Sequence, residues 1–266
     1  MAPRMAADRA QADWLLQPVA QLEPLDGERA EQEITELAVI AAEEGLPRLA
    51  RLLKANGVAR RFLLAAFDLS PFLRDLARRR PQMLDVLFDQ SVEQRLHAIA
   101  NEIAASWHVE GTSEASLMAE LRQLKTEAHF LIALSDLTEE SDTVLTVRRL
   151  SDLADSCTAA AVNFLLVDAN RQGKLKLVDP ANPSLKSGWI LLGMGKLGAH
   201  ELNFSSDIDL VVFFEPDGPA VGDPMEATDT FSRLTRRLVR ILQDRTENGY
   251  VFRTDLRLRP DPGSTP

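Results

Sequence analysis

The stretch Ser187–Phe214, SGWILLGMGKLGAHELNFSSDIDLVVFF, decides the fold, because it joins two apolar runs through a glycine-rich turn and a pair of acids. The turn, Gly193–Gly198, has the spacing G-x-G-x-x-G. The acids, in Asp207–Asp209, stand at the head of the second apolar run. These features point to different chemistry, since the glycine spacing occurs in dinucleotide sites and paired carboxylates serve metal-assisted reactions at phosphorus.

The spacing argues against a dinucleotide site. In such a site the glycine turn opens a full crossover helix, and the acid that binds the ribose stands about 20 residues on, after the next strand. Only eight residues separate Gly198 from Asp207, too few for that helix and its loops. The acids also precede the apolar run. A G-x-x-x-x-G-K-[ST] phosphate loop is excluded as well, because Lys196 lacks that spacing and a following hydroxyl.

The acid pair fits a metal site. Residues i and i+2 of a strand project to the same face, so the carboxylates of Asp207 and Asp209 are expected to point together. They repel each other unless a cation lies between them, and Mg²⁺ binds one or two carboxylates together with phosphate oxygens. Asp255, in FRTDLRLRP, is the candidate third acid for a two-metal site that promotes displacement at phosphorus. The sequence therefore predicts Mg²⁺ or Mn²⁺ on these three catalytic residues.

Several groups near these acids are candidates for binding phosphate or nucleotide. Glycines let backbone N–H groups approach a phosphate, while hydroxyl, ammonium and guanidinium groups donate to its oxygens. Each group also has a structural explanation, since glycines permit tight turns and charged residues commonly line exposed strands. The candidates are Gly193, Gly195, Lys196, Ser205, Ser206, Arg257 and Arg259. His200 is open between a surface residue and a substrate neighbour.

The residue composition and the pattern of apolar residues divide the chain into three parts. Residues 1–27 are expected to be extended or flexible, and residues 28–170 to form a helical domain. Apolar residues recur there at the helix period and glycines are few, which predicts five to seven packed helices. Residues 171–266 alternate between strand, turn and helix patterns, which predicts a second, smaller α/β domain.

Local signals place individual elements. Gly45 is expected to follow the C-terminus of one helix, and Ser70-Pro71 to open another that stops at Pro81. In the second domain, residues 188–193, 207–214 and 249–260 are expected to be strands, and residues 228–244 an amphipathic helix. The predicted buried faces comprise Ile34, Leu37, Ala38 and Ala41 in the first helix, and Phe231, Leu234, Leu238, Ile241 and Leu242 in the amphipathic helix.

Composition narrows the classes of function. The 266 residues are 45% hydrophobic and 26% charged, with a formal net charge of −10, which disfavours a nucleic-acid groove. Charged residues interrupt the N-terminus, and no apolar stretch is long enough to span a bilayer, so we expect no membrane segment and a cytoplasmic protein. The single Cys157 excludes an internal disulfide, and no Cys/His zinc spacing exists. A small-molecule or protein substrate is expected.

A resemblance to a known family follows from these motifs. Eleven residues lie between Gly195 and Asp207-x-Asp, which resembles the signature of polymerase-beta-like nucleotidyltransferases. GMGKLGAHELNFSSDIDL and FRTDLRLRPDPGSTP are similar to the N-terminal half of the glutamine synthetase adenylyltransferase family, and DLSPFLRDLARRRPQMLDVL agrees, so the resemblance covers residues 67–266. Lys196 departs from the superfamily, which usually has Ser after the motif glycine, although the family itself tolerates this lysine.

The resemblance implies an α+β fold, with a helical N-terminal domain followed by a small polymerase-beta-like domain that contains a mixed sheet. Residues 171–266 are then a nucleotidyltransferase domain truncated at its C-terminal end, and this fragment is expected to have weak or no activity alone. The implied reaction is phosphorolysis of AMP from a tyrosine of glutamine synthetase, which yields ADP and regulates nitrogen assimilation. ADP or ATP and inorganic phosphate are the implied nucleotide and phosphate ligands, and PII signalling protein and glutamine the implied regulators.

Two other interpretations stay open at this point. The chain could be another polymerase-beta-like nucleotidyltransferase that modifies a different acceptor, or a catalytically inert fragment that docks a partner through its helices. Transfer assays with alternative acceptors distinguish the first of these from an enzyme that acts on glutamine synthetase. Metal binding at the acid pair distinguishes an enzyme from the inert fragment.

Overall fold

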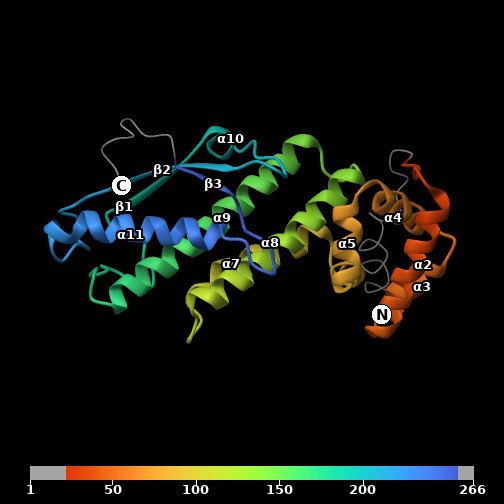
Figure 1. Cartoon of the computed structure of the whole chain (residues 1–266), viewed down its shortest axis with the longest axis horizontal. Coiled ribbons are helices and arrows are strands. Elements are labelled where there is room, and N and C mark those ends of the chain that lie inside the picture. The colour runs from red at the N-terminus through yellow and green to blue at the C-terminus, as the bar shows by residue number, and fades with distance from the viewer. Residues whose placement is uncertain (1–21, 257–266) are drawn as a thin grey trace, which may run out of the picture. The chain divides into compact units, whose positions relative to one another are not determined.

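The computed structural model describes residues 22–256, and Figure 1 traces this part from red at its N-terminal side to blue at its C-terminal side. These residues form helices followed by a small sheet, which confirms the predicted α+β class. The chain divides into two compact units. The first contains the described residues up to Ala98 together with Glu127–Thr146, and the second contains Ile99–Thr126 and the described residues from Val147 on.

The predicted domain division at residue 170 stays a prediction, because the compact units are defined in a different way. That division followed a change in composition, whereas the units follow contacts, which group residues 99–126 and most of a long helix with the sheet. The described residues also contain eight α-helices before the sheet, more than the five to seven expected, because short helices such as Gln82–Asp85 carry too few residues to show a period.

The first unit is built from short helices whose ends follow their sequence signals. Asp26 caps α2 by accepting from Arg29 N at 3.1 Å, and Gly45, with φ +73°, follows the end of that helix. Ser70 accepts from Leu73 N and Pro71 opens α5, as predicted. The helices are α2 (Gly27–Glu43), α3 (Pro47–Lys54), α4 (Val58–Leu69), α5 (Pro71–Arg79), α6 (Gln82–Asp85) and a 3₁₀ turn (Val86–Phe88).

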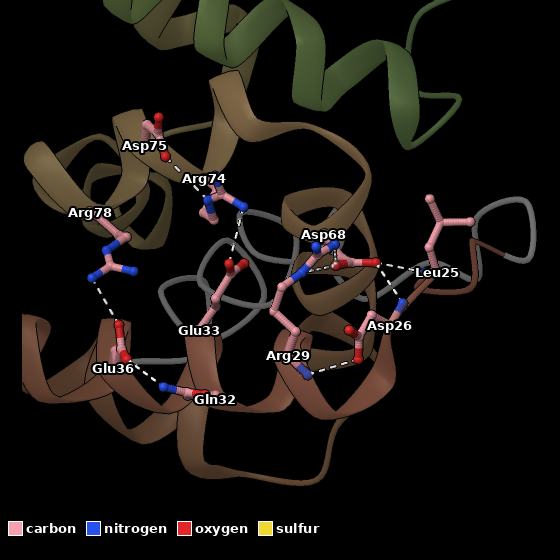
Figure 2. A network of polar contacts seen from close by, with 10 residues as sticks. All are labelled: Leu25, Asp26, Arg29, Gln32, Glu33, Glu36, Asp68, Arg74, Asp75 and Arg78. Carbon is pink, nitrogen blue, oxygen red and sulfur yellow. Dashed lines mark hydrogen bonds and ion pairs between the residues drawn. The ribbon is translucent and has the colours of Figure 1, made fainter.

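The predicted apolar face of α2 is buried, and ion pairs join the polar side of that helix to α4 and α5 (Figure 2). Buried Asp68 of α4 accepts from the Arg29 side chain and from Leu25 N at 2.6 Å. Farther along, Glu33 pairs with Arg74 at 3.0 Å, and Glu36 pairs with Arg78 at 2.8 Å. The buried Asp68 carboxylate is thus compensated by donors to both of its oxygens.

Three longer helices follow: α7 (Val92–Ser106), α8 (Glu114–Leu137) and α9 (Thr143–Arg171). Within the second unit, Arg237 bridges two of them, with N–O distances of 2.8 Å to Glu114 and 2.7 Å to Asp168. Helix α9 is long and apolar enough to cross a membrane, but 67% of its most apolar stretch is buried inside the protein. It therefore has the character of a core helix.

The sheet has three strands in the order β1-β2-β3 (Figure 1). Strand β1 (Trp189–Met194) pairs antiparallel with β2 (Ile208–Phe214), and β2 pairs parallel with β3 (Thr254–Asp255). The predicted mixed sheet is confirmed. A four-residue turn, α10 (Gly195–Gly198), follows β1, and the long helix α11 (Pro224–Gln243) separates β2 from β3.

Within the described residues, the third strand covers only Thr254–Asp255, whereas the sequence predicted a strand that begins at residue 249. Within the described residues, Val251 N and Phe252 N both donate to Leu242 O at the end of α11, at 2.9 and 3.0 Å. These groups therefore bond to a helix end and not to a neighbouring strand, so the extended pattern before Thr254 forms a loop. Residues 257–260 lie outside the described residues.

The two faces of the sheet differ in burial. On one face Trp189 and Leu210 are buried, and Phe214 stacks on Phe231 of α11 with ring centroids 5.2 Å apart. The predicted apolar face of α11 is buried in full, so this helix covers that face (Figure 1). The opposite face leaves apolar side chains exposed: Ile190, Leu192, Met194 and Phe213. Its polar end carries Asp209, the partner of Met194 in the ladder.

Candidate active site

The acid pair stands where β2 begins. Asp209 lies within the strand and Asp207 immediately precedes it, with fully buried Ile208 between them. Because residues i and i+2 share a face, both acids belong to the face opposite Ile208. Asp207 is exposed and Asp209 is half-buried. The buried isoleucine thus fixes which way this end of the strand turns its carboxylates.

Gly195 and Asp209 are in close contact across the first two strands. A Cβ atom placed on Gly195 would lie 2.6 Å from Asp209 Oδ2, well inside van der Waals contact. Gly195 also has φ +54°, in the left-handed region that favours glycine. This glycine is therefore required twice, by its backbone conformation and by the carboxylate beside it.

The other glycines of the motif serve the turn itself. A Cβ atom on Gly198 would lie 2.5 Å from the carbonyl oxygen of Gly193, so the turn folds back tightly onto the strand. Gly193 in turn lies against the side chain of Leu197, at 3.2 Å from a built Cβ. Close packing of a strand end on a short turn explains the G-x-G-x-x-G spacing without a dinucleotide.

Arg253 connects the acid pair to the segment before β3. Its Nε donates to Asp207 Oδ1 at 2.6 Å, and its Nη2 donates to Ser205 O at 2.7 Å. The two side chains of the ion pair are about half exposed, 53% for the arginine and 49% for the acid, so the pair adds little stability. The ion pair instead orients the Asp207 carboxylate, because it restricts how that group can turn.

Asp255 stands beside Asp209 in the parallel ladder. The register pairs Ile208 with Thr254 and Asp209 with Asp255, so the two acids share a sheet face. In residues 22–256, however, no three His, Cys, Asp or Glu side chains are gathered closely enough to form a metal site. The three-carboxylate metal cluster therefore stays a prediction.

The donor set at this edge fits a hard divalent cation. Asp207 and Asp209 offer carboxylate oxygens on one face, and Asp255 is next in register to the second of them. The contact of Gly195 with Asp209 leaves no side chain between the turn and that carboxylate. Mg²⁺ binds through one or two carboxylates and completes its shell with water and phosphate oxygens, which suits such an open edge.

The remaining predicted site residues are distributed around this edge. Lys196 is exposed in α10, and Ser205 is exposed in the loop before Asp207. The Ser206 hydroxyl donates to Asn203 Oδ1 at 2.7 Å, so in this structure its proton is directed to the loop. Arg257 and Arg259 lie outside the described residues.

His200 faces an acidic pair on α9. It has φ +56°, and its Nδ1 lies 3.7 Å from Asp152 Oδ1, with both side chains half exposed. Burial raises the pKa of the nearby Asp155 carboxyl, and the electrostatic interaction with His200 opposes that rise. The structure gives His200 an electrostatic partner on a core helix and no described contact with the acid pair.

Two residues near this region were missed at the level of sequence. Arg122 and Lys125 of α8 contact the segment that leads into β3. In the sequence they are two basic residues in a helical stretch, and no pattern distinguishes them from basic residues exposed to solvent. Only a long-range contact could identify them.

Comparison with protein families matches residues 60–266 to glutamate-ammonia ligase adenylyltransferase. Comparison with curated proteins finds relatives named bifunctional glutamine synthetase adenylyltransferase/adenylyl-removing enzyme. The relative from Mesorhizobium japonicum is 70% identical over 260 residues, which is 98% of this chain and 26% of the relative. The relative from Brucella suis is 55% identical over 98% of this chain and 27% of the relative. That from Rhizobium meliloti is 46% identical over 85% and 23%. The chain spans about a quarter of the length of these relatives.

Proposed function

Because the chain belongs to the glutamate-ammonia ligase adenylyltransferase family, we propose that it is a nucleotidyltransferase unit that removes AMP from a tyrosine of glutamine synthetase. The observation that carries this proposal is the edge of the sheet where Asp209 contacts the Gly195 turn and stands in register with Asp255. The sequence around that edge, ELNFSSDIDL, is similar to the adenylyl-removing version of the family motif. The names of the relatives support both activities of the longer proteins.

The proposed reaction is a phosphorolysis. An oxygen of inorganic phosphate attacks the AMP phosphorus and forms a new phosphorus–oxygen bond. The bond from that phosphorus to the tyrosine oxygen breaks, and the tyrosine oxygen then takes up a proton. The products are ADP and unmodified tyrosine. A phenol ionises near pH 10, so tyrosinate leaves with less help from an acid than an alkoxide needs.

The roles of the acids follow from their placement. Asp207 and Asp209 would hold Mg²⁺ or Mn²⁺, with Asp255 beside them to share the second ion or to orient the attacking phosphate. A bound divalent cation stabilises negative charge on phosphate oxygens. Arg253 restricts the Asp207 carboxylate through its Nε–H, so that acid is held in one orientation before any ligand arrives.

Phosphate groups are proposed to contact the turn and the loop that flank these acids. Gly193 and Gly195 keep side chains away from the turn, and Lys196 is exposed there to pair with phosphate oxygens. Ser205 and Ser206 would add donors, the latter after its hydroxyl leaves Asn203. Arg257 and Arg259 complete the proposed nucleotide-binding set from the stretch outside the described residues.

The proposed partners and location follow the family. Glutamine synthetase is the proposed protein substrate, with PII signalling protein and glutamine as regulators, in a cytoplasmic setting. The formal net charge of −10 disfavours nucleic acid as an alternative ligand.

Phosphorolysis is tested by incubating the 266-residue chain with adenylylated glutamine synthetase, inorganic phosphate and Mg²⁺, and by measuring ADP. We expect ADP release that requires phosphate and that is lost in Asp209→Asn. If Asp209→Asn releases as much ADP as the unchanged chain, the activity does not arise at this edge of the sheet. AMP transfer to other acceptors would instead indicate a different nucleotidyltransferase, and absence of both metal and nucleotide binding would indicate an inert docking unit.

A further inference from the structure

Arg122 of α8 is a buried charge with an unusual set of partners. Its relative exposure is 0%, and it is the largest of the fully buried side chains that the structure describes. The guanidinium donates to three main-chain carbonyl oxygens: Met118 O at 2.8 Å, Asp244 O at 2.6 Å and Gly249 O at 2.9 Å. A buried guanidinium is costly unless its donors are satisfied, so these bonds fix both the side chain and the carbonyls.

Two of these carbonyls stand at the ends of one turn. Asp244 directly follows α11, and Gly249, with φ +83°, closes the turn through a bridge to Thr246 with N–O distances of 2.9 and 3.0 Å. By binding both carbonyls, Arg122 fixes the distance between the entry and the exit of the turn. The direction in which the chain leaves α11 is thereby set from α8.

Lys125, three residues farther along α8, continues this contact. Its Nζ lies 5.2 Å from the ring centroid of Tyr250 and 5.6 Å from that of Phe252, within the range of cation–π attraction. Phe252 is buried, with 4% exposed, and its N–H donates to Leu242 O. Helix α8 thus contacts the segment from the turn to the residue that precedes Arg253.

The segment held in this way leads directly to the candidate site. Arg253 comes next and binds Asp207, and its carbonyl accepts from Ile208 N at 2.9 Å. Asp255 follows in register with Asp209. Strand β3 has only two described residues, so its ladder offers few bonds to set its position on β2. The segment before the strand therefore contributes to its position, together with the bond from Thr254 N to Gln243 Oε1 at 2.9 Å.

We propose that Arg122 is a positioning residue for the candidate site. By holding the turn of residues 244–249, it sets the register of β3 on β2, and with it the places of Asp255 beside Asp209 and of Arg253 on Asp207. Its relevance to catalysis rests on the proposed function, whereas its effect on the register is measurable without that function.

Amide hydrogen exchange tests the effect on register. The Ile208 amide donates to the carbonyl of Arg253, directly before β3, so its protection reports how firmly β3 is held on β2. The Glu215 amide, which donates to Gly188 O at 2.8 Å, reports the far end of the β1–β2 pair. In Arg122→Gln we expect the protection of Ile208 to fall roughly tenfold, because bonds to a buried charge are lost, while that of Glu215 is kept. Arg237→Gln is the matched control, since Arg237 is a partly buried arginine that pairs with Glu114 and Asp168.

The quantity to compare is the ratio of the protection of the Ile208 amide to that of the Glu215 amide. Arg237→Gln is expected to leave the Ile208-to-Glu215 ratio unchanged. An unchanged ratio in Arg122→Gln, or an equal fall at both amides, overturns the proposal. If Arg122→Gln does not fold, Arg122→Lys replaces it: an ammonium group cannot reach all three carbonyls at once, so the same change is expected at smaller size, and an unchanged ratio is again decisive.

A double-mutant cycle links the register to the site. We expect Arg122→Gln to weaken Mn²⁺ binding roughly tenfold in the otherwise unchanged chain and to have no further effect in Asp255→Asn, because both changes act through the same carboxylate. An equal loss in both backgrounds shows that Arg122 does not act through Asp255. If the unchanged chain binds no Mn²⁺, the proposed metal site is wrong, and the exchange measurement still decides the positioning role.

Discussion

Gly195 and Asp209 contact each other so closely that a single added methyl group would lie 2.6 Å from the carboxylate oxygen. Alanine at this position would also have to adopt φ +54°, which costs L-residues roughly 1 kcal/mol or more. We expect Gly195→Ala to lower the melting temperature and to weaken Mn²⁺ binding, because the displaced carboxylate is a proposed ligand. Gly222→Ala, where an added Cβ atom meets nothing within 4 Å, should change neither; equal effects of both would contradict the assignment.

Asp207→Asn and Asp209→Asn should each lower ADP release by about a hundredfold or more, since each removes a charge that faces the reacting phosphate groups. Stability should change by less than about 0.5 kcal/mol, because the acids are at least partly exposed and the Arg253 pair is solvated. ADP assays with glutamine synthetase and parallel urea denaturation measure the two effects. Near-normal turnover in either variant would show that the metal assignment is wrong.

Removal of Asp255 should change the response to metal. Adding Mg²⁺ or Mn²⁺ to the unchanged chain is expected to raise the melting temperature, by the linkage of binding to folding, worth about 2.7 kcal/mol at a hundredfold excess over Kd. Asp255→Ala should lose most of this gain. Asp217→Ala, in the exposed loop after β2, is the control and should keep it. A full gain in Asp255→Ala would remove this acid from the proposed site.

Lys125 should make stability rise at alkaline pH. Burial lowers the pKa of its ammonium group from 10.5 to about 8. Between these values the unfolded chain binds a proton that the folded chain does not, so the contribution is present above 10.5 and is lost as the pH falls toward 8. We expect the unchanged chain to gain on the order of 1 kcal/mol per pH unit over Lys125→Met in this window. Urea denaturation measures it, and Lys174→Met, at an exposed pair, should leave the profile unchanged.

Asp68 should also make stability rise with pH, but in the acid range. The hydrogen bond from the Arg29 side chain, with the N–H groups of Asp26 and Leu25, holds the pKa of the Asp68 carboxyl below 3.8. A lowered pKa contributes stability above the unfolded value, which is lost as the pH falls through the folded one. Asp68→Asn should therefore be less stable than the unchanged chain at neutral pH, with a difference that shrinks in acid. Asp75→Asn, at an exposed pair, is the control.

The sequence predicts those parts of the fold that depend on local pattern. Strands β1 and β2, the buried face of α11 and the ends of α2 and α5 lie where periodicity and capping residues put them. The common face of Asp209 and Asp255 also follows from alternation, once the two strands pair.

The remaining features depend on contacts between distant residues. Arg122 bonds to Gly249 and Asp244 across 127 and 122 residues, and no periodic pattern contains such a relation. Bonds from Val251 N and Phe252 N to Leu242 O also make the segment before Thr254 a loop, although its alternation is typical of a strand. The two compact units likewise depend on contacts, because helices of uniform composition contribute to both.

Because β1 and β2 pair as neighbours in sequence, two parts of the candidate site are expected to form at different times during folding. Gly195 and Asp209 are 14 residues apart, so they meet as soon as a local hairpin closes. Asp255 is 46 residues from Asp209, and its strand is held by a helix that lies more than 100 residues earlier in the chain. We expect the acid pair to form early in refolding and the third acid to arrive late. A destabilised chain would then lose the third carboxylate first, while the first two still faced solvent together.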